Sequence, residues 1–281
     1  MKRGAWIAIG VAALVLVAVG VLSLFGTKLS KGEPVAEAPV AEAEAPTPTK
    51  PQYPIEPSTP EPASLESSET PADEQAPEPE QPPLPSLADS DAPLRSELAQ
   101  TTGPSAVERF LVPDALIRKA VVTVDNLDSD PVSRRFRPVT QVQGTVPVIR
   151  SGDSIRLDSA NYARYEPWVQ AFTTASPEQL VAVYTRYYPL FQDAYEDLGY
   201  PDGYFNDRLV QIIDHLLATP EVTGPIALKQ PKVFFEFADP KLERLSWGQK
   251  ALIRIGPEQA RAVKQHLRSV RDTLLAQSGG Q

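Results

Sequence analysis

The chain has 281 residues and no cysteine, and its net charge of −9 is distributed unevenly. Residues 1–32 carry a charge of +4, residues 33–100 carry −13, and residues 101–281 are neutral. This pattern excludes a uniform globular chain and a basic nucleic-acid-binding domain, and the lack of cysteine excludes disulfides, thiolate metal sites and cysteine nucleophiles.

The amino-terminal region contains an uncharged apolar run at residues 5–25, flanked by Lys2, Arg3 and Lys28. As a helix it would be about 32 Å long, which matches a hydrocarbon core of about 30 Å. A cleaved signal peptide is the alternative, although its apolar region is usually only about 7–15 residues long. We therefore predict that residues 1–32 are a signal anchor with one transmembrane helix.

Basic residues on the two sides of this helix are nearly balanced in number, so they do not set its orientation. Signal anchors usually leave their amino terminus in the cytoplasm, and a cysteine-free, proline-rich tether suits a spacer in the cell envelope. The expected topology is a single-pass protein of the bacterial inner membrane with its domain in the periplasm.

Residues 33–85 contain 15 of the 30 prolines and a single aromatic residue, Tyr53. Such a segment buries too little apolar surface to offset the entropy of ordering it, so we predict a disordered linker. We interpret the linker as a passive spacer; the alternative is a recognition segment for a proline-binding domain.

Aliphatic and aromatic residues return at Ser86, and residues 86–276 are predicted to form one globular domain, followed by a disordered tail at 277–281. Apolar residues recur at helical spacing through most of it, and Ser176 followed by proline and glutamate is a strong helix start. Residues 148–157 read as a β-hairpin, and residues 226–237 as one or two strands. The fold class is therefore mainly α, an α+β helical domain with a small strand component. Helices are expected at about 90–100, 113–124, 158–167, 176–198, 206–217, 246–255 and 257–276.

No sequence motif for nucleophilic, metal-dependent or nucleotide-binding chemistry is present, and the two histidines are far apart in sequence. We therefore predict neither a cofactor nor a metal. The unusual segment is YPDGYFNDRLVQIIDHLLATP at residues 200–220, in which tyrosines and charged residues crowd a turn and the helix after it. Asn206 is a possible cap for that helix. Any binding or catalytic role is predicted to centre on Tyr200, Asp202, Tyr204, Asn206, Asp207, Arg208, Asp214 and His215.

The last predicted helix carries a row of basic residues opposite its apolar face. An anionic lipid or polymer could bind such a row, although an ordinary solvated helix face explains it equally. This secondary candidate consists of Arg261, Lys264, Arg268 and Arg271.

From about Leu84 to about Leu274 the chain resembles the bacterial domain-of-unknown-function family 3014. The resemblance rests on PLPSLADSD (83–91), LIRKAVVTVDNL (116–127), the 200–220 segment, PKVFFEFADP (231–240) and LSWGQKALIRIGPEQARAVKQHLR (245–268). It implies one amino-terminal membrane segment and a low-complexity linker, and it implies no activity, cofactor or catalytic residue.

The sequence is compatible with two functions. The first is a membrane-anchored, non-enzymatic binding or scaffolding module, whose partner is an envelope protein, peptidoglycan or another glycan. The second is an envelope hydrolase that uses Asp207, Asp214 or His215 as acid or base. A pocket in which these side chains converge would favour the enzyme.

Overall fold

The structure is a computed structural model that describes residues 50–55, 83–129 and 131–278. These residues form a mainly helical domain with one four-stranded antiparallel sheet, which confirms the α+β class. Within the described ranges no helix is both long and apolar enough to cross a membrane. The transmembrane helix predicted at residues 5–25 lies outside them.

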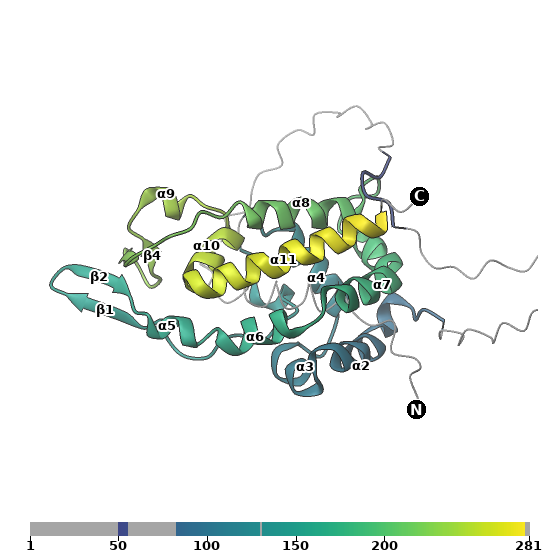
Figure 1. Cartoon of the computed structure of the whole chain (residues 1–281), viewed down its shortest axis with the longest axis horizontal. Helices are drawn as coiled ribbons and strands as arrows, with labels where there is room; N and C mark the ends of the chain where they lie inside the picture. The colour runs from purple at the N-terminus through teal and green to yellow at the C-terminus, as the bar shows by residue number, and fades with distance from the viewer. Residues whose placement is uncertain (1–49, 56–82, 130, 279–281) are drawn as a thin grey trace, which may run out of the picture.

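Four helices pack together to form most of the core. The long helix α7 contacts α4 and α11, and α8 lies against the same helices, as Figure 1 shows. Aromatic rings fill the space between α7 and α8: the ring centroid of Phe191 lies 5.4 Å from that of Tyr184 and 5.6 Å from that of Phe205. The bounds of these helices are Leu116–Asp125 (α4), Pro177–Asp197 (α7), Phe205–Leu217 (α8) and Pro257–Ser278 (α11).

Local sequence patterns account for these helices. Ser176 caps α7, because its hydroxyl oxygen accepts a hydrogen bond from the backbone N–H of Gln179 at 3.3 Å. Helix α8 buries Leu209, Ile212 and Ile213, the apolar face that the spacing predicts. Shorter elements surround the core: η1 (Leu87–Asp89), α2 (Asp91–Thr102), α3 (Pro104–Phe110), η2 (Arg134–Phe136), α5 (Ala160–Ala163), α6 (Glu166–Thr174), α9 (Pro240–Glu243) and α10 (Trp247–Arg254).

The sheet has the strand order β1-β2-β3-β4, with every neighbouring pair antiparallel. Its first two strands are the predicted hairpin, which turns at Gly152 with a φ of 56°. A separate small apolar cluster that includes Leu157, Leu228 and Phe237 supports it. The strand bounds are Val148–Ser151, Ser154–Leu157, Ala227–Lys229 and Glu236–Phe237.

The hairpin projects from one end of the molecule, and residues 50–55 lie at the opposite end (Figure 1). There they sit beside the amino-terminal end of α8 and the carboxy-terminal end of α11. The linker was predicted to be disordered along its whole length. Residues 50–55 depart from that expectation, since Ile55 packs against the main hydrophobic core.

Candidate functional site

Residues 50–55, which we call the strap, are held by two side chains in the first turn of α8. The backbone N–H groups of Gln52 and Tyr53 each donate to one carboxylate oxygen of Asp207, both at 2.8 Å. The side-chain amide of Asn206 donates to the backbone carbonyl of Tyr53, also at 2.8 Å. We call Asn206 and Asp207 the clasp. All three hydrogen bonds engage the backbone of the strap and none engages its side chains.

A side chain from α7 positions the clasp. The side-chain oxygen of Gln192 accepts the backbone N–H of Phe205 at 2.9 Å, and its nitrogen donates to the carbonyl of Gly203 at 2.8 Å. Gln192 thus satisfies a free amide at the start of α8. The prediction that Asn206 caps this helix is wrong, because the helix begins at Phe205 and Asn206 lies inside its first turn. Its side chain is thereby free to reach the strap.

The clasp lies close to two buried tyrosines of α7, Tyr184 and Tyr188. Asn206 has an exposed fraction of 0%, and the carbonyl of Tyr53 is the partner of its side-chain N–H₂. Beneath it, burial and then the nearby Asp207 carboxylate raise the pKa of Tyr188 to about 12. Burial also raises the pKa of Tyr184, and Asp207 adds to this effect. Asp207 is only partly buried, and Gln52, which donates to it, is exposed.

The strap sequence explains its pairing with a carboxylate. Pro51 and Pro54 have no N–H, so Gln52 and Tyr53 carry the amides between them, and Asp207 accepts both. The backbone bends at these two residues. Two consecutive N–H groups that point at one acceptor form an anion-binding nest, and hydrogen bonds to a carboxylate are stronger than neutral ones.

The strap was not predicted from the sequence, although the sequence contains a signal for it. Lys50 precedes a proline-x-x-proline motif, and this motif contains Tyr53, the aromatic residue of the linker. We had interpreted the linker as a passive spacer from its average composition.

Two of the predicted site residues belong to a structural network that ties α8 to α4. Arg208 donates through Nε to Asp125 at 2.9 Å, and through Nη1 and Nη2 to Asp128 at 2.8 and 2.9 Å. Its Nη2 also contacts the Asp125 carbonyl. Tyr200 donates to the same Asp125 carboxylate at 3.1 Å and stacks on Tyr195 with a ring-centroid distance of 4.6 Å.

The remaining predicted residues have separate partners, although several of them line one hollow. Asp214 forms an ion pair with Arg271, at 2.5 Å from its Nε, and Nε2 of His215 lies 2.8 Å from the hydroxyl of Ser246. Asp202 is exposed. Asp202, Tyr204, Asp207, Arg208 and Asp214 line a hollow of about 550 Å³ together with Gln52 and Tyr53 of the strap.

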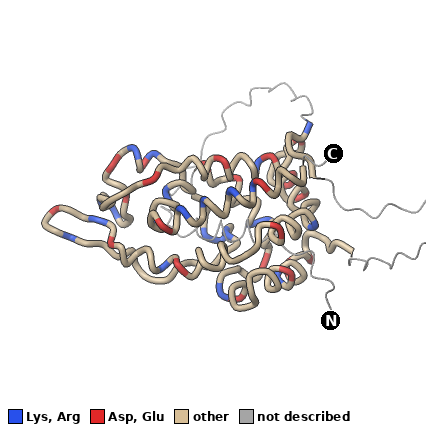
Figure 2. The backbone as a smooth tube through the Cα atoms, viewed as in Figure 1, with Lys and Arg blue, Asp and Glu red and all other residues tan. Residues whose placement is uncertain are grey.

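The four residues of the predicted basic row do not form one exposed surface. Arg261 and Arg268 are exposed, whereas Lys264 is buried and donates to the carbonyl of Thr219 at 2.8 Å. Arg271 faces α8, where it pairs with Asp214. In Figure 2 basic and acidic positions are interspersed along the helices in view.

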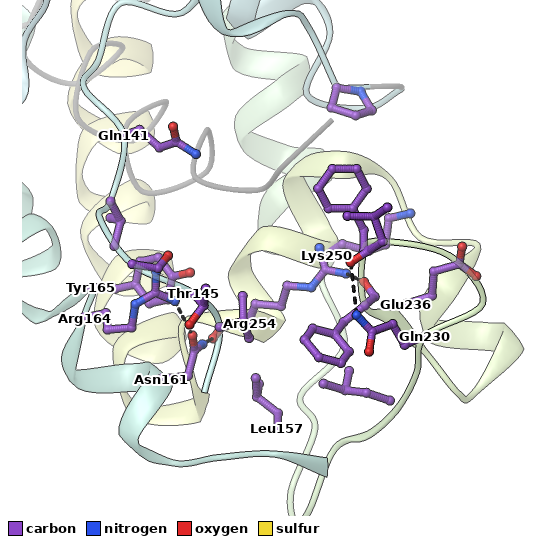
Figure 3. Close-up of a pocket in the computed structure, with 18 of the residues that line it drawn as sticks. Gln141, Thr145, Leu157, Asn161, Arg164, Tyr165, Gln230, Glu236, Lys250 and Arg254 are labelled. Atoms are coloured by element: carbon purple, nitrogen blue, oxygen red, sulfur yellow. Dashed lines mark hydrogen bonds between the residues drawn. The ribbon is translucent and has the colours of Figure 1, made fainter. Parts of the chain in front are cut away.

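A larger cavity of about 820 Å³ lies at the other end of the domain, between the sheet and helices α5, α9 and α10. Figure 3 shows Arg164, Tyr165 and Asn161 on one side of it and Lys250, Glu236 and Gln230 on the other. Nothing in the sequence predicted this cavity, because its walls come from four separate parts of the chain.

The basic residues of this cavity are engaged by the chain itself. Arg164 donates to Asn161 and to the carbonyl of Gly144, each at 2.9 Å. Lys250 pairs with Glu243 at 3.2 Å. Arg254 donates to a backbone carbonyl, and burial lowers the pKa of its guanidinium. These contacts fix the walls of the cavity.

The fold and the clasp define a mainly helical α+β domain that grips a bent polypeptide segment at the start of a helix. Residues 116–271 match the family described as "Protein of unknown function (DUF3014)", and because this match covers more than half of the chain, the protein belongs to that family. This confirms the family resemblance. No curated protein and no solved structure matches the chain.

Proposed function

We propose that this protein is a membrane-anchored binding module of the bacterial cell envelope, and that its periplasmic domain binds a polypeptide segment at the clasp. One observation carries the proposal: Asn206 and Asp207 make three hydrogen bonds to consecutive backbone groups of a segment distant in sequence. Side chains that engage only backbone groups can accept any sequence able to present two adjacent N–H groups and a carbonyl.

The boundaries of the family match support a partner from another chain. The matched residues 116–271 include the clasp and Gln192, which positions it, whereas the strap lies outside them. The clasp therefore lies within the matched region, and the strap lies in the linker that precedes it. A polypeptide of another protein that presents the same backbone groups would fit the same place.

The arrangement of acid–base candidates favours binding over hydrolysis. Asp207 is occupied by two N–H groups, Asp214 by Arg271, and His215 lies beside the hydroxyl of Ser246. A general acid and a general base must both reach one substrate bond. Asp207 and Asp214 line the same hollow, but each is engaged by other groups of the chain, and His215 does not line that hollow, so we place the alternative hydrolase function second.

A peptide-binding measurement tests the function. The full-length chain with Gln52→Pro and Tyr53→Pro lacks both strap amides, which leaves the clasp open. A fluorescent peptide of residues 48–57 should bind this variant saturably, as followed by fluorescence anisotropy. Adding Asp207→Asn should weaken binding at least tenfold, because one acceptor oxygen becomes a donor group. Asp193→Asn, an exposed change on α7, is the matched control.

Equal binding by the Asp207→Asn and Asp193→Asn variants would refute the clasp as the binding site. The topology needs its own test. An alkaline phosphatase fused to the carboxy terminus should be active if the domain is periplasmic, and an inactive fusion with an active cytoplasmic reporter at the same place would refute the localisation.

A further inference from the structure

We propose that the strap is the internal competitor of the clasp: residues 50–55 occupy the site in the resting chain, and a partner polypeptide binds by displacing them. This inference rests on the proposed function, since it concerns the same site. In the structure, the chain's own linker supplies every backbone group that the clasp engages.

The attachment of the strap is suited to reversible release. It consists of three hydrogen bonds and the partly buried Ile55, at the rim of a hollow whose other walls belong to the domain. Gln52 and Pro54 are exposed, and Tyr53 is only half-buried. Displacement therefore leaves the remainder of the hydrophobic core in place.

The covalent connection between the strap and the domain sets the affinity that a partner needs in order to displace the strap. The strap is separated from the first residue of the described domain by 27 residues, 56–82. Tethering of this kind gives effective concentrations on the order of 1 mM. If the free strap peptide binds with a Kd of about 0.1 mM, the clasp is closed about ten to one, and a partner binds about tenfold more weakly than to an open clasp.

The strap also defines the chemistry of the partner. It must present two consecutive N–H groups and the carbonyl of the second residue, as Gln52 and Tyr53 do. An apolar residue two positions later would replace Ile55 against the core. Proline on both sides lowers the entropy lost on binding, because its φ is already fixed. The partner we infer is a proline-bracketed segment of another envelope polypeptide.

The amide of Tyr53 reports directly on whether the strap is bound. Only nine tyrosines are present, so ¹⁵N-tyrosine labelling of the full-length chain gives few signals, and Tyr53→Phe identifies the signal of interest. Hydrogen exchange at this amide should be slowed about tenfold by its bond to Asp207. Asp207→Asn should abolish the protection, and Asp193→Asn should leave it unchanged. Added peptide 48–57 should remove the protection saturably.

The second measurement is affinity. The same peptide should bind the chain with Gln52→Pro and Tyr53→Pro about tenfold more tightly than the unmodified chain. An unprotected Tyr53 amide, or protection that rises with protein concentration because a second copy supplies the strap, would overturn the internal competitor. Equal affinity for both chains would also overturn it, while leaving the proposed function standing. Absence of peptide binding to every variant, with Tyr53 still protected, would instead refute the proposed function.

Discussion

Substitution of Arg208 by alanine should destabilise the domain by about 2–3 kcal/mol, although this residue is a direct neighbour of the clasp. The side chains of Arg208, Asp125 and Asp128 have exposed fractions of 17%, 12% and 27%. Removing one partner from a buried ion pair costs about 3–5 kcal/mol, because the other charge stays buried and unpaired. Water can reach these carboxylates in part, so we place the value below that range.

For a domain of this size, a loss of 2–3 kcal/mol lowers the unfolding midpoint by roughly 4–12 °C. Thermal unfolding of the purified full-length chain, followed by circular dichroism, measures the shift. Asp207→Asn should lower the midpoint by no more than the roughly 3–6 °C that loss of the strap would cost, since Asp207 holds the strap rather than the α4–α8 contact. A shift of less than about 1 °C for Arg208→Ala would refute the assignment of Arg208 to the scaffold.

Three further predictions concern stability and are measured by urea unfolding. Burial lowers the pKa of His266 below its ordinary value of 6.5. The contribution of the neutral imidazole to the stability of the fold is therefore fully present above pH 6.5 and is lost as the pH falls through the folded-state pKa. Stability should be lower at pH 5.5 than at pH 7.5, and His266→Leu should reduce that difference. Gly256→Ala should destabilise by about 2–4 kcal/mol, because φ is +97° and the new Cβ would lie 2.6 Å from the ring of Tyr162; a loss below 1 kcal/mol would contradict this. Asp214→Asn should change stability by no more than about 1 kcal/mol, since its ion pair with Arg271 is partly exposed, and a loss above 3 kcal/mol would show that the pair is structural.

Elements set by local periodicity were predictable from the sequence. The start of α7, the apolar face of α8 and the β1–β2 hairpin all depend on residues within about ten positions of one another. Asn206 and Asp207, which hold the strap, lie within the crowded segment at 200–220 where the candidate site was predicted. The spacing of apolar residues correctly indicated a mainly helical domain with few strands.

Features that depend on distant residues were not predictable in the same way. The linker was interpreted from its own inability to form a core. Gln52 and Tyr53 nevertheless form hydrogen bonds with residues more than 150 positions away, and Ile55 packs against the core of the domain. Asn206 was expected to cap its helix, but Gln192 performs that role from α7. Lys264 was expected in an exposed basic row, and instead reaches the carbonyl of Thr219.

Replacing residues 50–55 by glycine and serine should lower the stability of the chain by a small and recoverable amount. Anything that binds only the folded state stabilises it by RT ln(1 + [L]/Kd), and for the strap the effective concentration takes the place of [L]. A ratio of about ten gives roughly 1.4 kcal/mol, or about 3–6 °C in the unfolding midpoint. Because the stabilisation arises from occupancy of the clasp, peptide 48–57 at about 1 mM should restore most of it, whereas a peptide with proline at the positions of Gln52 and Tyr53 should not. A loss above 4 kcal/mol that no peptide restores would mean that the strap is an integral part of the core.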